Sequence, residues 1–238
     1  MIVLGFDTAT SATAVALGLP DGRTLEARDD PVPGAHPGHA TRLLEMAAGL
    51  LGDGGIGWPQ VERLAVGVGP GTFTGLRVGV ATARGLAQSL GCELVGVSSL
   101  RALALPAAEA GAVLAVIDAR RGEVFAAAYA RGGVELLPPR ALAPDLLGEA
   151  LAGLVPDGVP WLALGDGAVR YREAVEAAGA SVPEDSSPQH LLRAAAVCEL
   201  GARQETGGDL GLVLPDYRRR PDAELALASA PSGGMGGR

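Results

Sequence analysis

The 238-residue sequence contains no lysine and no asparagine, so all nineteen of its basic residues are arginines. The absence of lysine excludes Schiff-base chemistry and a Walker-type phosphate lysine, and the absence of asparagine excludes Asn-linked glycans. Aromatic residues make up only 3% of the chain, whereas 48% of it is hydrophobic. This composition predicts a globular protein with a sizeable aliphatic core.

Long apolar runs and paired cysteines are also lacking. Charged residues such as Asp7 and Asp118 interrupt every apolar stretch before the roughly 18 residues that a membrane span needs. The first residues carry no basic segment of the kind that opens a signal peptide. Cys92 and Cys198 lie far apart, outside any CxxC spacing, and are expected to be small buried residues. We therefore expect a cytoplasmic protein without a membrane anchor.

The net charge of −8 argues against a broad nucleic-acid surface, because phosphate binding needs concentrated positive charge. Arg218, Arg219 and Arg220 form the one dense basic cluster in the sequence. Such a run is usually a solvated turn.

The chain contains the same pattern twice. An apolar strand ends at Asp7 and is followed by a hairpin, a helix over 40–51, a strand over 64–68 and a helix over 72–90. A second apolar strand ends at Asp118 and is followed by the same order of elements, with helices near 144–154 and 171–178. Two duplicated βββαβα subdomains predict an α/β protein with the actin-like ATPase (ASKHA, ribonuclease H-like) fold.

We place the subdomain boundary near residues 98–106. The first subdomain then covers 1–103 and is joined by a C-terminal helix at about 214–230, which crosses back onto it. The second covers 104–213, and residues 231–238 form a disordered tail.

Asp7, Thr8 and Thr10 lie where this fold places its first phosphate loop, in which backbone amides hold a phosphate and the aspartate orients a metal-bound water. An active loop wants glycine two residues after the aspartate, but this chain has Ala9. The second counterpart has Arg120 at the same position after Asp118. The sequence therefore favours aspartates that cap hairpin turns over a working nucleotide site.

Small residues recur every four positions along the second helix, at Gly75, Gly79, Ala83 and Ala87. Glycine inside a helix costs about 1 kcal/mol relative to alanine, so two of them require a reason, and close approach of another backbone is the natural one. That backbone belongs either to a partner or to the chain's own sheet, and the pattern alone leaves both open.

The three histidines do not form a recognisable metal site. His36 and His39 are separated by proline and glycine, and His190 lies in the other half of the chain. We expect a loop residue and a helix-entry residue, and no bound metal.

Together these segments resemble the TsaB/YeaZ family. The resemblance runs from Ile2 to about Glu224 and rests on GFDTATSATAVAL, HATRLLEMAAGLL, AVGVGPGTFTGLRVGVATARGLA, VGVSSL, IDARRGEVFAAAY and LPDYRRRPDAE. The segment GPGTFTGLRVG is the most specific of them.

The resemblance implies a non-catalytic scaffold or activator subunit that pairs with the catalytic paralogue TsaD. A TsaE-like ATPase joins this complex, which transfers threonylcarbamoyl to the adenosine beside the anticodon of ANN-decoding tRNAs. ATP, ADP and metal are then expected on the partner subunits, tRNA is contacted indirectly through the complex, and a homodimer is an option without the partner. The partner interface that the resemblance implies consists of His39, Leu43, Ala47, Leu50, Gly75, Gly79, Ala83 and Ala87.

Two alternatives remain. The first is an active ATP-dependent kinase or ATPase of the same fold, which Ala9 and Arg120 disfavour. The second is a metallopeptidase, for which the sequence offers no credible set of ligands.

Overall fold

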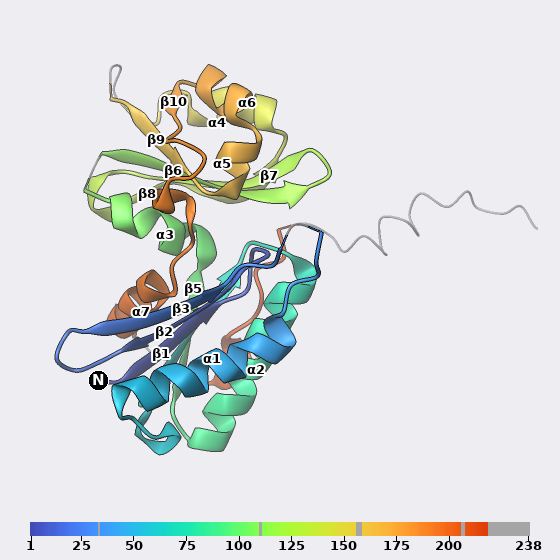
Figure 1. The fold of residues 1–238 in the computed structure, drawn as a ribbon. Helices are drawn as coiled ribbons and strands as arrows, with labels where there is room; N and C mark the ends of the chain where they lie inside the picture. The colour runs from blue at the N-terminus through green and yellow to red at the C-terminus, as the bar shows by residue number, and fades with distance from the viewer. Residues whose placement is uncertain (33, 110, 156–158, 206–207, 219–238) are drawn as a thin grey trace, which may run out of the picture.

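The computed structural model describes residues 1–32, 34–109, 111–155, 159–205 and 208–218. It forms two α/β subdomains, stacked one above the other in Figure 1. The predicted C-terminal helix from about residue 221, the tail at 231–238, and Arg219 and Arg220 lie outside the described residues. Within them, no helix is long and apolar enough to cross a membrane.

The first subdomain is a five-stranded sheet in the order β3-β2-β1-β4-β5. Strand β1 pairs antiparallel with β2 and parallel with β4. Its elements are β1 (Val3–Asp7), β2 (Thr13–Gly18), β3 (Thr24–Asp29), α1 (His39–Gly54), β4 (Arg63–Gly69), α2 (Phe73–Leu90) and β5 (Glu93–Ser98). Helices α1 and α2 lie side by side on one face of this sheet (Figure 1).

The second subdomain repeats this plan, because its sheet order β8-β7-β6-β9-β10 matches the first sheet strand for strand. Its elements are β6 (Ala112–Arg120), β7 (Glu123–Tyr129), β8 (Glu135–Leu142), α4 (Leu147–Leu151), β9 (Trp161–Leu164), α5 (Asp166–Arg170), α6 (Arg172–Ala177) and β10 (Ala180–Ser181). The predicted duplication and the actin-like, ribonuclease H-like fold class are confirmed. The helices of this half are shorter and more broken than the sequence predicts.

Two helices fill the space between the sheets: α3 (Ser99–Ala104) and α7 (Ala194–Arg203). Helix α3 occupies the predicted boundary and contacts both β4 and β6. Helix α7 packs on β1, β2 and β4, although it lies within the range 104–213 that the sequence assigns to the second subdomain. The close approach depends on Gly5 of β1, because a Cβ there would lie 2.6 Å from the Sγ of Cys198 in α7. The assignment of 104–213 to one subdomain is therefore wrong for α7, which closes the first sheet from the second half of the chain.

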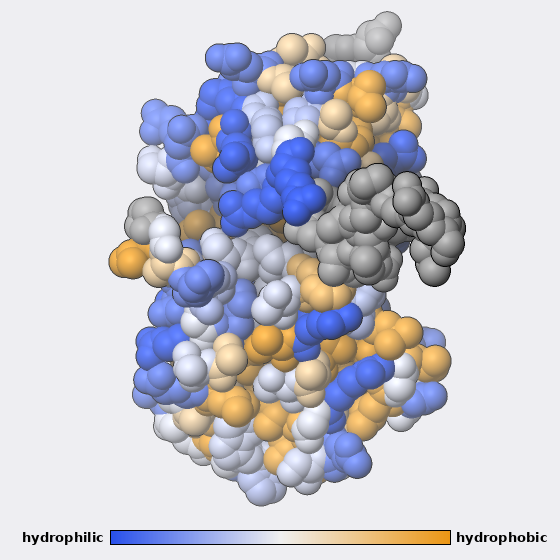
Figure 2. Space-filling model, turned by 90° about the vertical axis from the view of Figure 1, so that its right-hand side faces the viewer, coloured by the Kyte–Doolittle hydropathy of each residue, from blue (hydrophilic) through white to orange (hydrophobic). Residues whose placement is uncertain are grey.

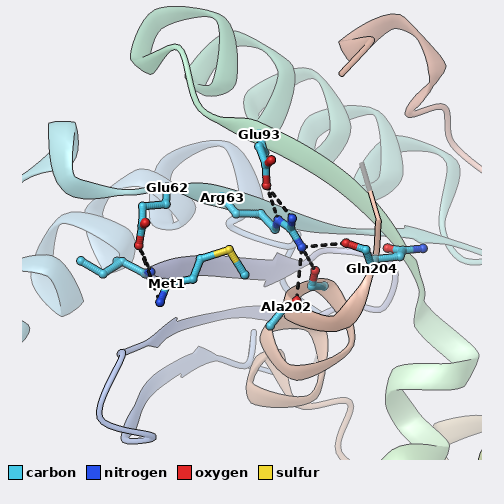
Figure 3. Close-up of polar contacts among 8 residues, drawn as sticks. Met1, Glu62, Arg63, Glu93, Ala202 and Gln204 are labelled. Atoms are coloured by element: carbon cyan, nitrogen blue, oxygen red, sulfur yellow. Dashed lines mark hydrogen bonds and ion pairs between the residues drawn. The ribbon is translucent and has the colours of Figure 1, made fainter. Parts of the chain in front are cut away.

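Arg63 fixes the end of α7 to the sheet (Figure 3). Its Nη1 donates to the carbonyl oxygens of Gly201 (2.7 Å), Ala202 (3.3 Å) and Gln204 (2.8 Å), which are carbonyls at the C-terminal end of the helix. Its Nε donates to Glu93 at 2.8 Å. A buried cation at a helix C-terminus satisfies orphan carbonyls and complements the helix dipole.

Replacing Arg63 with methionine should therefore lower the free energy of unfolding by about 2–3 kcal/mol, because the carbonyl oxygens at the end of α7 and Glu93 lose their partner. Urea unfolding followed by circular dichroism measures the change. A loss below about 0.5 kcal/mol would show that water replaces the guanidinium without cost.

Candidate functional site

Asp7 ends β1 at the centre of the first sheet, and both of its carboxylate oxygens are occupied within the chain. Oδ1 accepts a hydrogen bond from the Ala9 amide at 2.7 Å, and Oδ2 accepts one from the Ser99 hydroxyl at 2.6 Å. Only 1% of Asp7 is exposed, and a Cβ on neighbouring Gly67 would overlap its Oδ2. The carboxylate links the hairpin to the start of α3 and faces no open space.

The rest of the predicted phosphate loop is closed by the start of α2. Thr8 is fully buried, and its hydroxyl donates to the Gly75 carbonyl at 2.7 Å. The Ala9 carbonyl accepts from the Thr72 amide at 2.7 Å. Thr10 lines a cavity, and its Oγ1 accepts from the Ala12 amide at 3.3 Å. The hydrogen bonds of the loop tie Thr8 and Ala9 to the start of α2.

At the second candidate phosphate loop, which follows Asp118, other groups of the protein contact the aspartate. The Arg120 amide donates to Asp118 at 2.9 Å, and the Arg120 and Arg170 guanidiniums lie 3.5 Å and 3.7 Å from this carboxylate. Arg120 and Arg121 both adopt positive φ, at 64° and 54°. This conformation favours glycine, yet the chain places two bulky residues there.

A cavity of about 320 Å³ lies between the subdomains, next to Thr10. Its walls carry charges of both signs, including Arg28, Asp30, Asp166 and Arg170. Burial raises the pKa of the Asp166 carboxyl, mainly because it removes water from the charged form. The same carboxyl accepts a hydrogen bond from the Asp118 amide at 3.1 Å. The cavity thus offers no concentrated positive surface for a triphosphate.

Metal ligands do not gather among the described residues: no three His, Cys, Asp or Glu side chains are placed to share an ion there. His39 is 4% exposed, and its Nδ1 lies 2.9 Å from the Thr13 hydroxyl. Burial lowers its pKa. His190 lies in the second half, where its Nδ1 accepts from the Gly165 amide at 3.2 Å, and His36 is exposed on its loop.

The small-residue stripe of α2 faces the chain's own sheet. A Cβ on Gly79 would lie 2.4 Å from Thr8 Oγ1, and one on Gly75 would lie 2.0 Å from the Thr8 carbonyl oxygen. Ala83 and Ala87 are buried in the core beneath the helix. The interpretation of this stripe as a partner interface is wrong, because the close approach that it permits is between α2 and the β1–β2 hairpin.

The predicted interface residues of α1 are buried in the same way. His39, Leu43, Ala47 and Leu50 are each less than 8% exposed and lie on the side of the helix that packs on the sheet. They therefore belong to the core of the subdomain and are not available to a partner.

The opposite face of the helix pair is exposed. On α1 it carries Ala40, Leu44 and Ala48 at helical spacing, and on α2 it carries the exposed Ala81 and Gly85 with the half-buried Val78. Leu44 is 45% exposed, and a Cβ on Gly85 would meet nothing within 4 Å. We call these six residues the outer face. In Figure 2 hydrophobic surface gathers over the lower half of the molecule, which contains α1 and α2, and is broken by hydrophilic strips.

The sequence carried a signal for the outer face. On α2 the face away from the buried stripe carries the small or apolar residues Val78, Ala81 and Gly85, where a solvated helix would have more charge. The buried stripe of Gly75, Gly79, Ala83 and Ala87 on the opposite side of α2 was the stronger pattern, and it was interpreted as the partner interface instead.

Comparison with known proteins agrees with this architecture. Residues 33–158 match the family described as TsaD: tRNA N6-adenosine threonylcarbamoyltransferase. The chain is 42% identical over 134 residues to the tRNA threonylcarbamoyladenosine biosynthesis protein TsaB of Escherichia coli, a match that covers 55% of this chain and 56% of the relative. This match therefore spans little more than half the length of that relative. The protein of the same name from Bacillus subtilis is 30% identical over 229 residues, covering 94% of this chain and 96% of the relative.

The chain belongs to the TsaB/YeaZ family. The YeaZ structure from Pseudomonas aeruginosa superimposes with a TM-score of 0.72 at 31% identity, covering 91% of this chain and 99% of that one. The whole-length match shows that the fold of both subdomains is shared with this family member.

Asp7→Asn tests whether this TsaB/YeaZ-family aspartate is structural. Burial raises the pKa of Asp7 above 3.8, although the Ser99 and Ala9 hydrogen bonds oppose the shift. The folded state therefore keeps a proton that the unfolded state has lost, and the contribution of Asp7 to stability is lost as pH rises through the folded pKa.

Asparagine does not ionise, so the stability of Asp7→Asn relative to the native chain should rise between about pH 4 and about pH 7. Urea unfolding at both pH values measures this difference. A difference that falls with pH would mean that the ionised carboxylate stabilises the fold.

Proposed function

We propose that this chain is the non-catalytic subunit that activates a TsaD-like transferase in the synthesis of threonylcarbamoyladenosine on tRNA. Two relatives, each named tRNA threonylcarbamoyladenosine biosynthesis protein TsaB, support a role in this synthesis. The observation that carries the non-catalytic role is the closed loop, in which Asp7 and Thr8 bind the protein itself. A phosphoryl-handling subunit of this fold needs that loop open, so ATP, ADP and metal belong on the partner subunits.

The partner surface that we propose is the outer face of α1 and α2. The transferase family matches residues 33–158, a segment that includes both helices, so a TsaD-like protein carries a related helix pair. Two related pairs can pack against each other about a pseudo-twofold axis, as in an isologous interface. The small side chains of the outer face let helices approach closely, and burying Leu44 and Val78 supplies apolar area. A second copy of the chain could use the same face when the partner is absent.

The expected relations to tRNA and to a TsaE-like ATPase follow from the net charge of the chain and from the proposed pathway. With a net charge of −8, the chain itself contributes little to tRNA binding, and Arg218 is already paired with Asp216 at 2.6 Å. The tRNA is therefore held mainly by the complex, which a TsaE-like ATPase joins. The pathway places this complex in the cytoplasm.

Size-exclusion chromatography of the purified chain with the TsaD-like paralogue of the same genome tests the pairing. We expect a stable heterodimer, and calorimetry of the isolated chain with ATP and magnesium should show no submillimolar binding. Two separate peaks would refute the pairing, and tight ATP binding would favour the kinase or ATPase alternative, which the closed loop disfavours.

A further inference from the structure

Residues 209–217 leave the second half of the chain and run back along α2, and we call this segment the strap. Arg84 of α2 donates through Nη2 to the Gly211 carbonyl at 2.6 Å, and the Asp216 amide donates to the carbonyl of Val68 in β4 at 2.7 Å. These bonds make the strap a fixed part of the surface of the first subdomain, beside α2.

Arg77 joins the beginning of α2 to the end of the strap. Its guanidinium carbon lies 3.8 Å from the centre of the Phe73 ring, and its Nε donates to the Tyr217 hydroxyl at 3.1 Å. The rings of Phe73 and Tyr217 pack together with their centres 5.1 Å apart. This stack holds the guanidinium in one orientation, which lowers the entropy that is lost when it binds another group.

No acidic side chain pairs with Arg77 in the part of the chain that the structure describes. The residue is exposed, and among the same residues its terminal nitrogens Nη1 and Nη2 form no hydrogen bond. A guanidinium presents these N–H groups in a planar fork that matches a carboxylate. Arg77 is therefore a preorganised cation at the surface, suited to an acidic group of another protein.

The strap borders the outer face of α1 and α2. Arg77 and Arg84, which hold the strap, lie four residues before and three residues after Ala81, so they are its neighbours on the surface of the helix. Apolar surface continues on the strap, where Leu214 is 61% and Tyr217 42% exposed. The outer face and the strap thus adjoin along α2.

The outer face alone is too small for a stable complex. A specific interface buries about 800 Å² of each partner and involves about 20–30 residues a side. The outer face has six residues, and only Leu44 among them is larger than valine. The interface must therefore extend beyond the helix pair, and the adjoining Arg77 and Tyr217 are of the residue types that are enriched at interface hot spots.

We propose that Arg77, Leu214 and Tyr217 continue the partner interface beyond the outer face, with Arg77 paired to a carboxylate of the TsaD-like partner. This inference rests on the heterodimer proposed above and adds the charge that the partner presents at this edge. In the chain's own sequence, Asp222 and Glu224 follow the strap and are the competing carboxylates.

Arg77→Gln should weaken the complex with the TsaD-like paralogue at least about tenfold, measured by calorimetry at low ionic strength. The affinity of the native complex should fall as salt is added, and this dependence should be smaller in Arg77→Gln because an ion pair is missing. Arg77→Lys keeps the charge without the planar fork, so it should retain the salt dependence and recover part of the affinity. Leu214→Ser should weaken the complex at least about threefold, because apolar contact is lost.

Arg140→Gln is the matched control, because it removes an exposed arginine from β8 in the second subdomain and should bind as the native chain does. Each isolated variant should melt within a few degrees of the native chain, since all of these side chains lie at the surface. Native affinity in Arg77→Gln would overturn the inference and leave the heterodimer standing, whereas no complex with the native chain would refute the heterodimer as well.

The double variant Asp222→Asn with Glu224→Gln tests the chain's own carboxylates. If Arg77 acted through them, the double variant would weaken the complex as much as Arg77→Gln does, and combining the changes would add nothing. We expect native affinity in the double variant, measured in the same calorimetry. An equal and non-additive loss would overturn the pairing of Arg77 with the partner.

Discussion

Ala81→Arg is expected to abolish the heterodimer with the TsaD-like partner, lowering the affinity at least about thousandfold, or roughly 4 kcal/mol. Ala81 lies at the centre of the outer face, between Val78 and Gly85, and is exposed in the monomer. An arginine there would hold the two helix pairs apart and bring a charge into an apolar contact. Because alanine and arginine both favour helix, the chain itself should keep its melting temperature.

Ala177→Arg is the matched control for this variant. Ala177 is exposed at the end of α6 in the second subdomain, far in sequence and fold from the outer face. Native affinity in Ala177→Arg together with lost affinity in Ala81→Arg would locate the interface. Native affinity in both variants, measured by calorimetry with the partner, would mean that the partner binds elsewhere.

Gly79→Leu is expected to prevent folding. A Cβ at this position would already lie 2.4 Å from Thr8 Oγ1, and three further carbons would displace the fully buried Thr8 beneath α2. The loss should exceed about 4 kcal/mol, which is a large part of the stability of an ordinary domain. Circular dichroism and the soluble yield measure the outcome. The sequence-based interpretation of the stripe as an interface makes the opposite forecast, a folded monomer that cannot bind its partner.

Gly85→Leu is the counterpart on the other side of the same helix. A Cβ on Gly85 meets nothing within 4 Å, so leucine should raise the stability of the monomer by about 0.8 kcal/mol through helix propensity alone. The same leucine would project from the outer face and weaken the complex. A destabilised Gly85→Leu, or a folded Gly79→Leu, would contradict the orientation of α2.

The sequence predicted the duplicated fold because its signals are local. The apolar strands through Asp7 and Asp118, the hairpins after them and the helix near Thr72 all depend on short-range periodicity. The structure has each of them, with β6 continuing to Arg120 and α2 beginning at Phe73. Ala9 and Arg120 indicated a degenerate phosphate loop, which stays a prediction; in the structure Thr8 and Ala9 of the first loop form hydrogen bonds with the start of α2.

The orientation of α2 could not be derived in the same way. Gly75 and Gly79 indicate that another backbone approaches the helix, but spacing along a helix does not say which backbone it is. The answer depends on Thr8, which is 67 residues from Gly75 in sequence and lies under the helix only in the folded chain. The residues that the stripe suggested as partner contacts are instead buried against the chain's own sheet.

The position of α7 is a second long-range property. The sequence predicted no helix at these positions, and the place of α7 on the first sheet is set by Arg63 and by Cys198 beside Gly5, contacts that span more than 130 residues. Burial raises the pKa of the Cys198 thiol to about 12, in keeping with the expected structural cysteine.

The most direct test of the account is a reconstituted transfer assay that counts threonylcarbamoyladenosine formed on tRNA from the threonylcarbamoyl adenylate. The assay compares this chain alone, the TsaD-like and TsaE-like partners without it, and all three with ATP. The account predicts repeated turnover only with all three, and its loss when Ala81→Arg replaces the native chain. Product formed by this chain alone, above the level of the Asp7→Asn variant, or an undiminished yield in its absence, would contradict the role of a non-catalytic activator.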